Sequence, residues 1–286
     1  MDSKLDLSTP EALAEQVERL NDADLEAAVV ERGLEDALDE VFGAMATRFL
    51  PERAGGERAV IQWDVRVAGS THTYGLTLDG AQCSVTKGPA SAPRVTLGTD
   101  LPAFLRIVAG RLSGLQAFST GRLQVSGDVV IALRQQMWFD ADLSQARIQI
   151  ATPGELARLI DGRTDAEIEA GVALNGVDRT LEKVFHGMVE HFRPDRAPRK
   201  RSVVEFHIRS EQGDRVYQFV AGPDGAAYHA GPTDESHVRV RVLFPDFLRM
   251  VAGKLHGIKA FTQGRVKVRG NLLLARKIHN WFDMGS

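Results

Sequence analysis

Apolar and polar side chains alternate along two widely separated stretches of the chain. From 59 to 67, Ile61 and Trp63 fall on one face while Gln62 and Asp64 fall on the other. Successive side chains of a β-strand point to opposite faces, so this period of two predicts a strand in a sheet that is covered on one side. A later stretch repeats the pattern, with Val204, Phe206 and Ile208 alternating with Glu205, His207 and Arg209. The sequence therefore predicts a half-buried sheet twice.

Helical spacing and turn residues predict the other elements around the first of these strands. Thr9-Pro10 is typical of a helix start, because Thr caps free amides and Pro fits the first turn. Leu38, Phe42 and Met45 recur at helical spacing. Asp79-Gly80 predicts a hairpin. We further expect helices at 23–31, 34–50, 114–119 and 128–139, a helix from Leu101 that is capped by Thr99 or Asp100 and closed by Gly110, and strands at 72–78, 82–86, 93–98 and 121–126.

The chain matches itself from end to end at an offset of 143 positions. The match is strongest between 102–140 and 245–283, where 19 of 39 positions are identical. A constant offset over this length indicates a duplication, and two copies are too few for a solenoid. We therefore expect two similar domains. They are 1–143, with N-terminal helices at 9–37 and a core at about 38–140, and 144–286, with helices at 152–180 and a core at about 181–283.

The order of elements within each repeat predicts the fold class. Each repeat reads as helices, an antiparallel meander of strands, helices, one more strand and a final helix. This order favours an α+β fold in which helices pack on one face of a mostly antiparallel sheet.

One segment of each repeat resembles a known family. From Leu101 to Asp128 the chain reads as a helix, Gly-Arg-Leu-Ser-Gly, a short helix, and Gly-Arg-Leu-Gln-Val-Ser-Gly-Asp. From Phe244 to Asn271 it repeats this as Gly-Lys-Leu-His-Gly and Gly-Arg-Val-Lys-Val-Arg-Gly-Asn. Both segments resemble the sterol carrier protein type 2 domain family, over roughly 40–140 and 183–283. The resemblance implies a five-stranded sheet with helices over one face. It also implies an apolar cavity for a sterol, a fatty acid, an acyl-CoA thioester or a phospholipid.

The last helix of each repeat is the predicted wall of such a cavity, together with the helix before the Gly-Arg/Lys-Leu turn. A helix that is apolar nearly all round is either ordinary core or a boundary between core and cavity. The predicted ligand-binding residues of the first repeat are Phe104, Val108, Phe118, Val125, Val129, Leu133 and Met137. Those of the second repeat are Phe247, Val251, Phe261, Val268, Leu272 and Trp281.

Motifs for catalysis or metal binding are missing from the sequence. It has no Gly-x-Ser-x-Gly, no His-Glu-x-x-His and no Cys-x-x-Cys. Seven of the eight histidines lie in the second repeat, and none of these aligns with a histidine of the first. We therefore expect non-catalytic binding or transfer of a lipid, with no cofactor and no metal. Two alternatives stay open. One is a cyclase or isomerase that uses His229 or another histidine of the second repeat, and the other is an interaction module with filled cavities.

Charge divides the two repeats. The first has 13 Lys and Arg against 21 Asp and Glu, a net charge of −8, and the second has 22 against 17, a net charge of +5. Opposite charges favour docking of the two halves, and the basic half also suits transient contact with an anionic membrane. Aromatic residues are sparse among the basic ones, which argues against nucleic acid as a partner. The single cysteine, Cys83, and an acidic start without an apolar run predict a cytoplasmic protein.

Overall fold

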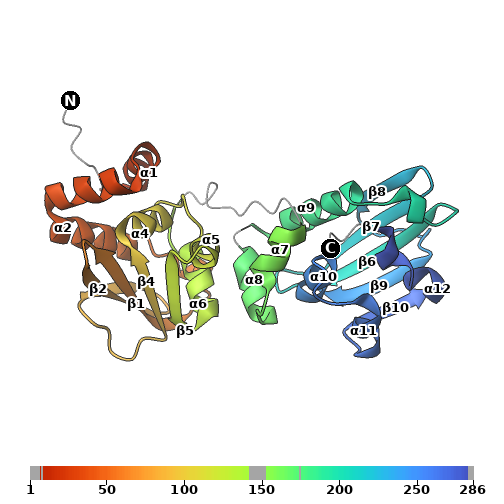
Figure 1. Ribbon diagram of the computed structural model, residues 1–286. Coiled ribbons are helices and arrows are strands. Elements are labelled where there is room, and N and C mark those ends of the chain that lie inside the picture. The colour runs from red at the N-terminus through yellow and green to blue at the C-terminus, as the bar shows by residue number, and fades with distance from the viewer. Residues whose placement is uncertain (1–6, 8, 142–152, 174, 283–286) are drawn as a thin grey trace. The chain divides into compact units, whose positions relative to one another are not determined.

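The computed structural model of the chain describes residues 7, 9–141, 153–173 and 175–282. The chain divides into two compact units, Met1–Ile148 and Gln149–Ser286. Each unit contains one five-stranded sheet, with the strand order β3-β2-β1-β4-β5 in the first and β8-β7-β6-β9-β10 in the second. Helices lie over one face of each sheet (Figure 1). The strand order is the same in both units, so the predicted α+β fold in two tandem copies is confirmed.

The elements of the two units correspond one to one over most of their length. The first unit contains α1 (Pro10–Arg19), α2 (Asp22–Thr47), α3 (Pro51–Ala54), β1 (Arg58–Val67), β2 (Ser70–Asp79), β3 (Cys83–Lys87), β4 (Val95–Asp100), α4 (Leu101–Val108), α5 (Gly114–Ser119), β5 (Leu123–Gly127), α6 (Val129–Arg134) and the 3-10 helix η1 (Gln135–Trp138). The second contains α7 (Pro153–Ile160), α8 (Asp165–Ala173), α9 (Val177–Glu190), η2 (Pro194–Arg196), β6 (Ser202–Arg209), β7 (Arg215–Gly222), β8 (Gly225–Ala230), β9 (Val238–Leu243), α10 (Phe244–Val251), α11 (Gly257–Thr262), β10 (Val266–Gly270), α12 (Leu272–Ala275) and η3 (Ile278–Trp281).

Several of these boundaries follow from capping and turn residues. The Thr9 side chain accepts a hydrogen bond from the amide three residues later, at 3.1 Å, and so caps α1. Asp100 caps α4 in the same way at 2.7 Å. The Asp79 side chain accepts hydrogen bonds from two backbone amides of the turn between β2 and β3, where Gly80 has a φ of +98°. Thr152, the counterpart of Thr9, lies outside the described residues.

Two features differ from the expectation. The helices expected at 23–31 and 34–50 form one element, α2, which kinks at Gly33 with a φ of +108°. Strand β4 does not extend the meander, because it crosses from the edge strand β3 to the far side of β1 and pairs with β1 in parallel. β9 pairs with β6 in the same way. The crossover brings α4 and α10 back over the covered face of each sheet.

Aromatic stacking holds the helices on each sheet. In the first unit, Phe42 of α2 stacks on Tyr74 of β2 with ring centroids 4.1 Å apart and on Phe104 of α4 at 4.8 Å. In the second unit, Phe185 of α9 stacks on Phe247 of α10 at 5.4 Å. Within the described part of the chain, no helix combines the length and the apolar character needed to cross a membrane.

Candidate functional site

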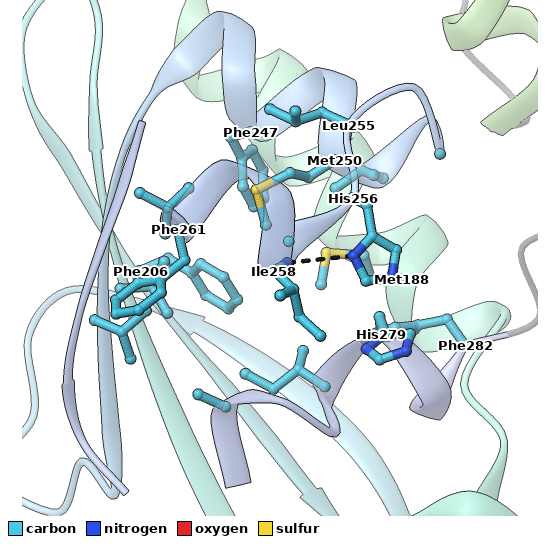
Figure 2. Close-up of a pocket in the computed structure, with 18 of the residues that line it drawn as sticks. Met188, Phe206, Phe247, Met250, Leu255, His256, Ile258, Phe261, His279 and Phe282 are labelled. Atoms are coloured by element: carbon cyan, nitrogen blue, oxygen red, sulfur yellow. Dashed lines mark hydrogen bonds between the residues drawn. The ribbon is translucent and has the colours of Figure 1, made fainter. Parts of the chain in front are cut away.

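A pocket of about 650 Å³ lies in the second unit, which is within the size range of small-molecule sites. Figure 2 shows side chains from the sheet and from the helices that line it. The lining residues come from α7, α9, β6, β9, α10, α11, β10, α12 and η3 and from the segments beside them, and most are apolar. They are Leu156, Lys183, Val184, Gly187, Met188, His191, Phe206, Val240, Phe247, Met250, Val251, Gly253, Leu255, His256, Gly257, Ile258, Phe261, Thr262, Val266, Val268, Leu272, Ala275, Arg276, Ile278, His279 and Phe282.

Most of the ligand-binding residues predicted for the second repeat lie at this pocket. Phe247 and Val251 reach it from α10, Phe261 from α11, Val268 from β10 and Leu272 from α12. The sixth, Trp281, is 1% exposed in the core and is not among the lining residues. Binding by these side chains stays a prediction.

The residues predicted for the first repeat lie in packed surroundings. Phe104 is fully buried and contacts Phe42 and Trp63, with ring centroids at 4.8 and 5.2 Å. Val108 and Val125 are half-buried against the same core. The others, Phe118, Val129, Leu133 and Met137, are half-buried. All residues that line the pocket of Figure 2 belong to the second unit.

A buried glutamine joins the corresponding segments of the first unit. The Gln136 side-chain amide donates to the carbonyl oxygens of Ile107 at 2.8 Å and Leu112 at 2.9 Å. Its carbonyl oxygen accepts from the Gly114 amide at 3.1 Å. These three bonds join η1 to the end of α4 and the start of α5. The neighbouring Leu115 is only 6% exposed.

Histidines occupy the same region of the second unit. His279 aligns with Gln136 at the 143-residue offset, and His256 aligns with Ser113. Both histidines are exposed, and their rings meet edge to face with centroids 4.9 Å apart. Ile258, the counterpart of Leu115, is 42% exposed. His256, Ile258 and His279 all line the pocket of the second unit.

The charged groups at the pocket are basic. Lys183, His191 and Arg276 line it together with His256 and His279, and the lining includes no Asp or Glu. Arg265 follows a turn glycine and is a candidate for a ligand head group, but it donates to the buried Asp246 at 3.0 Å, and this hydrogen bond raises the pKa of Arg265. No cluster of potential metal ligands occurs among the residues that the structure describes.

Two other polar groups lie outside the pocket lining. His229 is exposed on β8, so the residue named for an acid–base role is not at the pocket. Glu205 is buried on β6 and accepts from the Thr233 amide at 2.8 Å, with His207 at 2.6 Å and Arg239 as further partners. Burial alone would raise the pKa of Glu205, but these hydrogen bonds outweigh it and lower the pKa.

His256 and His279 could not be singled out from the sequence, because each histidine, taken alone, is typical of a surface residue. The signal that could have found them is the comparison of the two repeats. At 113/256 and 136/279 a polar residue of one copy becomes a histidine in the other, inside the segment where the copies agree best.

Comparisons with known proteins agree with this architecture. The model of the SCP-2 sterol transfer family matches residues 50–140 and 189–283. The hydroxysteroid dehydrogenase-like protein 2 of Mus musculus is 26% identical over 98 residues, which cover 34% of this chain and 20% of that protein. The peroxisomal multifunctional enzyme type 2 of Mus musculus is 26% identical over 161 residues, 55% of this chain and 19% of that enzyme. The chain thus spans about a fifth of the length of these curated relatives.

Solved structures with some likeness include single sterol carrier domains. The crystal structure of sterol carrier protein 2 like 2 from Aedes aegypti is 21% identical with a TM-score of 0.31, and the match covers 37% of this chain and 98% of that one. The sec-alkylsulfatase Pisa1 from Pseudomonas sp. is 15% identical with a TM-score of 0.34, over 64% of this chain and 30% of that one.

Proposed function

This chain belongs to the SCP-2 sterol transfer family, and from that premise we propose that its second unit binds a lipid or another apolar small molecule and transfers it through water. The observation that supports this function is the pocket of about 650 Å³ with a mostly apolar lining. Sterols, fatty acids and acyl-CoA thioesters are the ligand classes to test first. Five of the six residues that the sequence predicts for ligand binding in the second repeat line this pocket, which favours binding in it.

The driving force is transfer of the ligand from water to the pocket. Burying a dozen methylenes is worth about 10 kcal/mol, at about 0.8 kcal/mol each. Association costs of roughly 4–15 kcal/mol offset much of this gain. Micromolar affinity and fast exchange are therefore expected, and both suit a carrier.

A thermal titration of the full chain tests the proposal. Ligands that bind only the folded protein raise the melting temperature in proportion to the logarithm of their free concentration. Leu272→Asp places a charge at the pocket wall, where the side chain is 52% exposed, and it should abolish the shift. Val30→Asp is the matched control, at 48% exposure on α2 of the first unit. The absence of a shift with every ligand class in the unaltered chain would contradict the proposal.

We also propose that the wall of the pocket contacts an anionic membrane during transfer. Leu273 is 73% exposed and Phe261 46%, and these residues lie on α12 and α11 beside the pocket. Exposed apolar side chains next to basic ones are typical of membrane-contact surfaces. The basic neighbours are the exposed Lys259, Arg276 and Lys277.

Two further expectations from the sequence are kept as proposals. The first is that the unit with a net charge of −8 docks on the unit with +5. Small-angle scattering at low and high salt tests it, because salt screens attraction between surface charges. An extended particle already at low salt would count against docking. The second is a cytoplasmic location, which microscopy of a tagged chain would check.

A further inference from the structure

We propose that His256 and His279 form a head-group site for an amphiphile that ends in an anion, either a carboxylate or a phosphate ester. This inference rests on the proposed function, because it assigns one end of the ligand that the pocket takes. The apolar body would lie among the aromatic and methionine side chains, and the anion would lie beside the two imidazole rings, within reach of a nitrogen of each.

The geometry of the two rings supports this assignment. They lie edge to face with centroids 4.9 Å apart, and both line the pocket. Figure 2 shows them on the same side of the pocket, with Phe206 on the other side. A group at this position can reach both rings while its apolar part extends between Met250 and Phe206.

The hydrogen bonding of the rings leaves a donor for an anion. Nδ1 of His256 accepts the Ile258 amide at 3.3 Å and caps α11 (Figure 2). A neutral imidazole that accepts at one nitrogen carries its proton on the other, so Nε2–H of His256 is a donor. His279 makes no hydrogen bond through its ring within the described residues, so both of its nitrogens are available to a ligand.

The electrostatic surroundings favour a negative ligand over a positive one. Lys183 of α9, His191 just after α9 and Arg276 just after α12 line the same pocket, and the lining includes no carboxylate. Nearby acids have partners: Asp246 pairs with Arg249 and Arg265. A pocket lined by charges of one sign raises the local concentration of ligands of the opposite sign.

The first unit shows that the fold does not need imidazoles at these positions. Ser113 stands where His256 does and caps α5 by accepting the Gln116 amide at 3.0 Å. Gln136 stands in the place of His279 and has all its hydrogen bonds within the protein. Where the first unit has two buried polar residues with hydrogen-bond partners, the second unit has two exposed rings at the pocket, and a role in binding explains both differences.

Calorimetric titration of the full chain with four ligands of one chain length tests this site. The ligands are dodecanoate, dodecyl phosphate, dodecan-1-ol and methyl dodecanoate, each below its critical micelle concentration. Because hydrogen bonds to ionised groups are about twice as strong as neutral ones, we expect an anionic ligand to bind about tenfold or more tightly than the alcohol and the ester. The tighter of the two anions identifies the head group as carboxylate or phosphate.

Variants assign the preference to the rings. In His256→Asn the amide oxygen replaces Nδ1 as the cap of α11 while the Nε2 donor is lost, and in His279→Phe the ring is kept without its nitrogens. The double variant should lose the preference for anions and bind the alcohol as the unaltered chain does. His229→Asn, an exposed histidine of β8, is the control and should keep the preference.

Two results would overturn the assignment: equal affinity for anionic and neutral ligands in the unaltered chain, or an undiminished preference in the double variant. Each variant is accepted only if its melting temperature without ligand matches that of the unaltered chain. Binding of the alcohol without any preference for anions refutes the head-group site and leaves the proposed function intact. Failure of all four ligands to bind refutes both.

Discussion

Gln136 gives the most direct test of why the two units differ. We expect Gln136→Met to loosen the first unit around residues 107–115, because methionine has a similar length but cannot make the three hydrogen bonds of the glutamine. The carbonyl oxygen of Ile107 would still accept a hydrogen bond from the Gly110 amide, at 3.1 Å. The Gly114 amide and the Leu112 carbonyl would lose the partner that Gln136 provides.

The magnitude follows from these bonds. Each hydrogen bond contributes a net 0.5–1.5 kcal/mol, and a buried group left unsatisfied costs about 1–3 kcal/mol. Because Gln136 is 8% exposed and two of its partners would have no replacement, we expect the free energy of unfolding of the first unit to fall by about 3 kcal/mol. His279 is exposed, so His279→Met should change the stability of the second unit by less than about 0.5 kcal/mol.

Amide hydrogen exchange measured by mass spectrometry follows each unit separately. Exchange of the segment 107–115 should accelerate in Gln136→Met, while exchange of 250–258 should stay as in the unaltered chain. Urea unfolding gives the free energies. If Gln136→Met leaves the exchange of 107–115 unchanged and the free energy of unfolding within about 0.5 kcal/mol of that of the unaltered chain, the glutamine does not hold this segment in place.

Further predictions concern other parts of the chain. His279→Gln should introduce into the second unit the three hydrogen bonds that Gln136 makes in the first, and so shrink the pocket. A titration should then show weaker binding of apolar ligands, whatever their head group. Leu273→Glu should weaken binding to anionic vesicles in a sedimentation assay while Val30→Glu does not, and equal losses would argue against membrane contact through α12. The folded pKa of Glu205 is lowered from 4.5, so its stabilisation is present above the unfolded pKa and is lost as pH falls through the folded pKa. Urea unfolding of Glu205→Gln should therefore depend less on pH below about 5 than that of the unaltered chain, and parallel pH profiles would refute this. Burial raises the pKa of Cys83 to about 11, so iodoacetamide should modify it far more slowly at pH 8 than a free thiol, and an equal rate would contradict this.

Local signals explain why much of the fold could be predicted. The alternation at 59–67, the cap at Asp100 and the turn at Asp79-Gly80 depend on residues close in sequence, and the structure has β1, α4 and the hairpin there. The parallel pairing of β4 with β1 depends on contacts between distant residues, which periodicity does not report. The kink at Gly33 could not be told from a break between two helices, because a glycine between two helical patterns is typical of both.

The difference between the two units could not be predicted from apolar patterning. Phe104 and Phe247 are phenylalanines at equivalent positions of the two repeats, and Val108 and Val251 are valines at equivalent positions. Gln136 is hydrogen-bonded to three backbone groups of a distant segment, and only the structure brings these together. The sequence indicates that position 136/279 changes between the copies, but not what the change does.

Uptake of a lipid by the second unit can be measured by native mass spectrometry of the full chain, before and after incubation with dodecanoate and dodecan-1-ol. We expect one added ligand per chain, a larger bound fraction with dodecanoate, and no addition in Leu272→Asp under the same conditions. A chain that keeps its unliganded mass with both ligands, or a Leu272→Asp variant that binds as the unaltered chain does, would show that the second unit does not take up a lipid in this pocket.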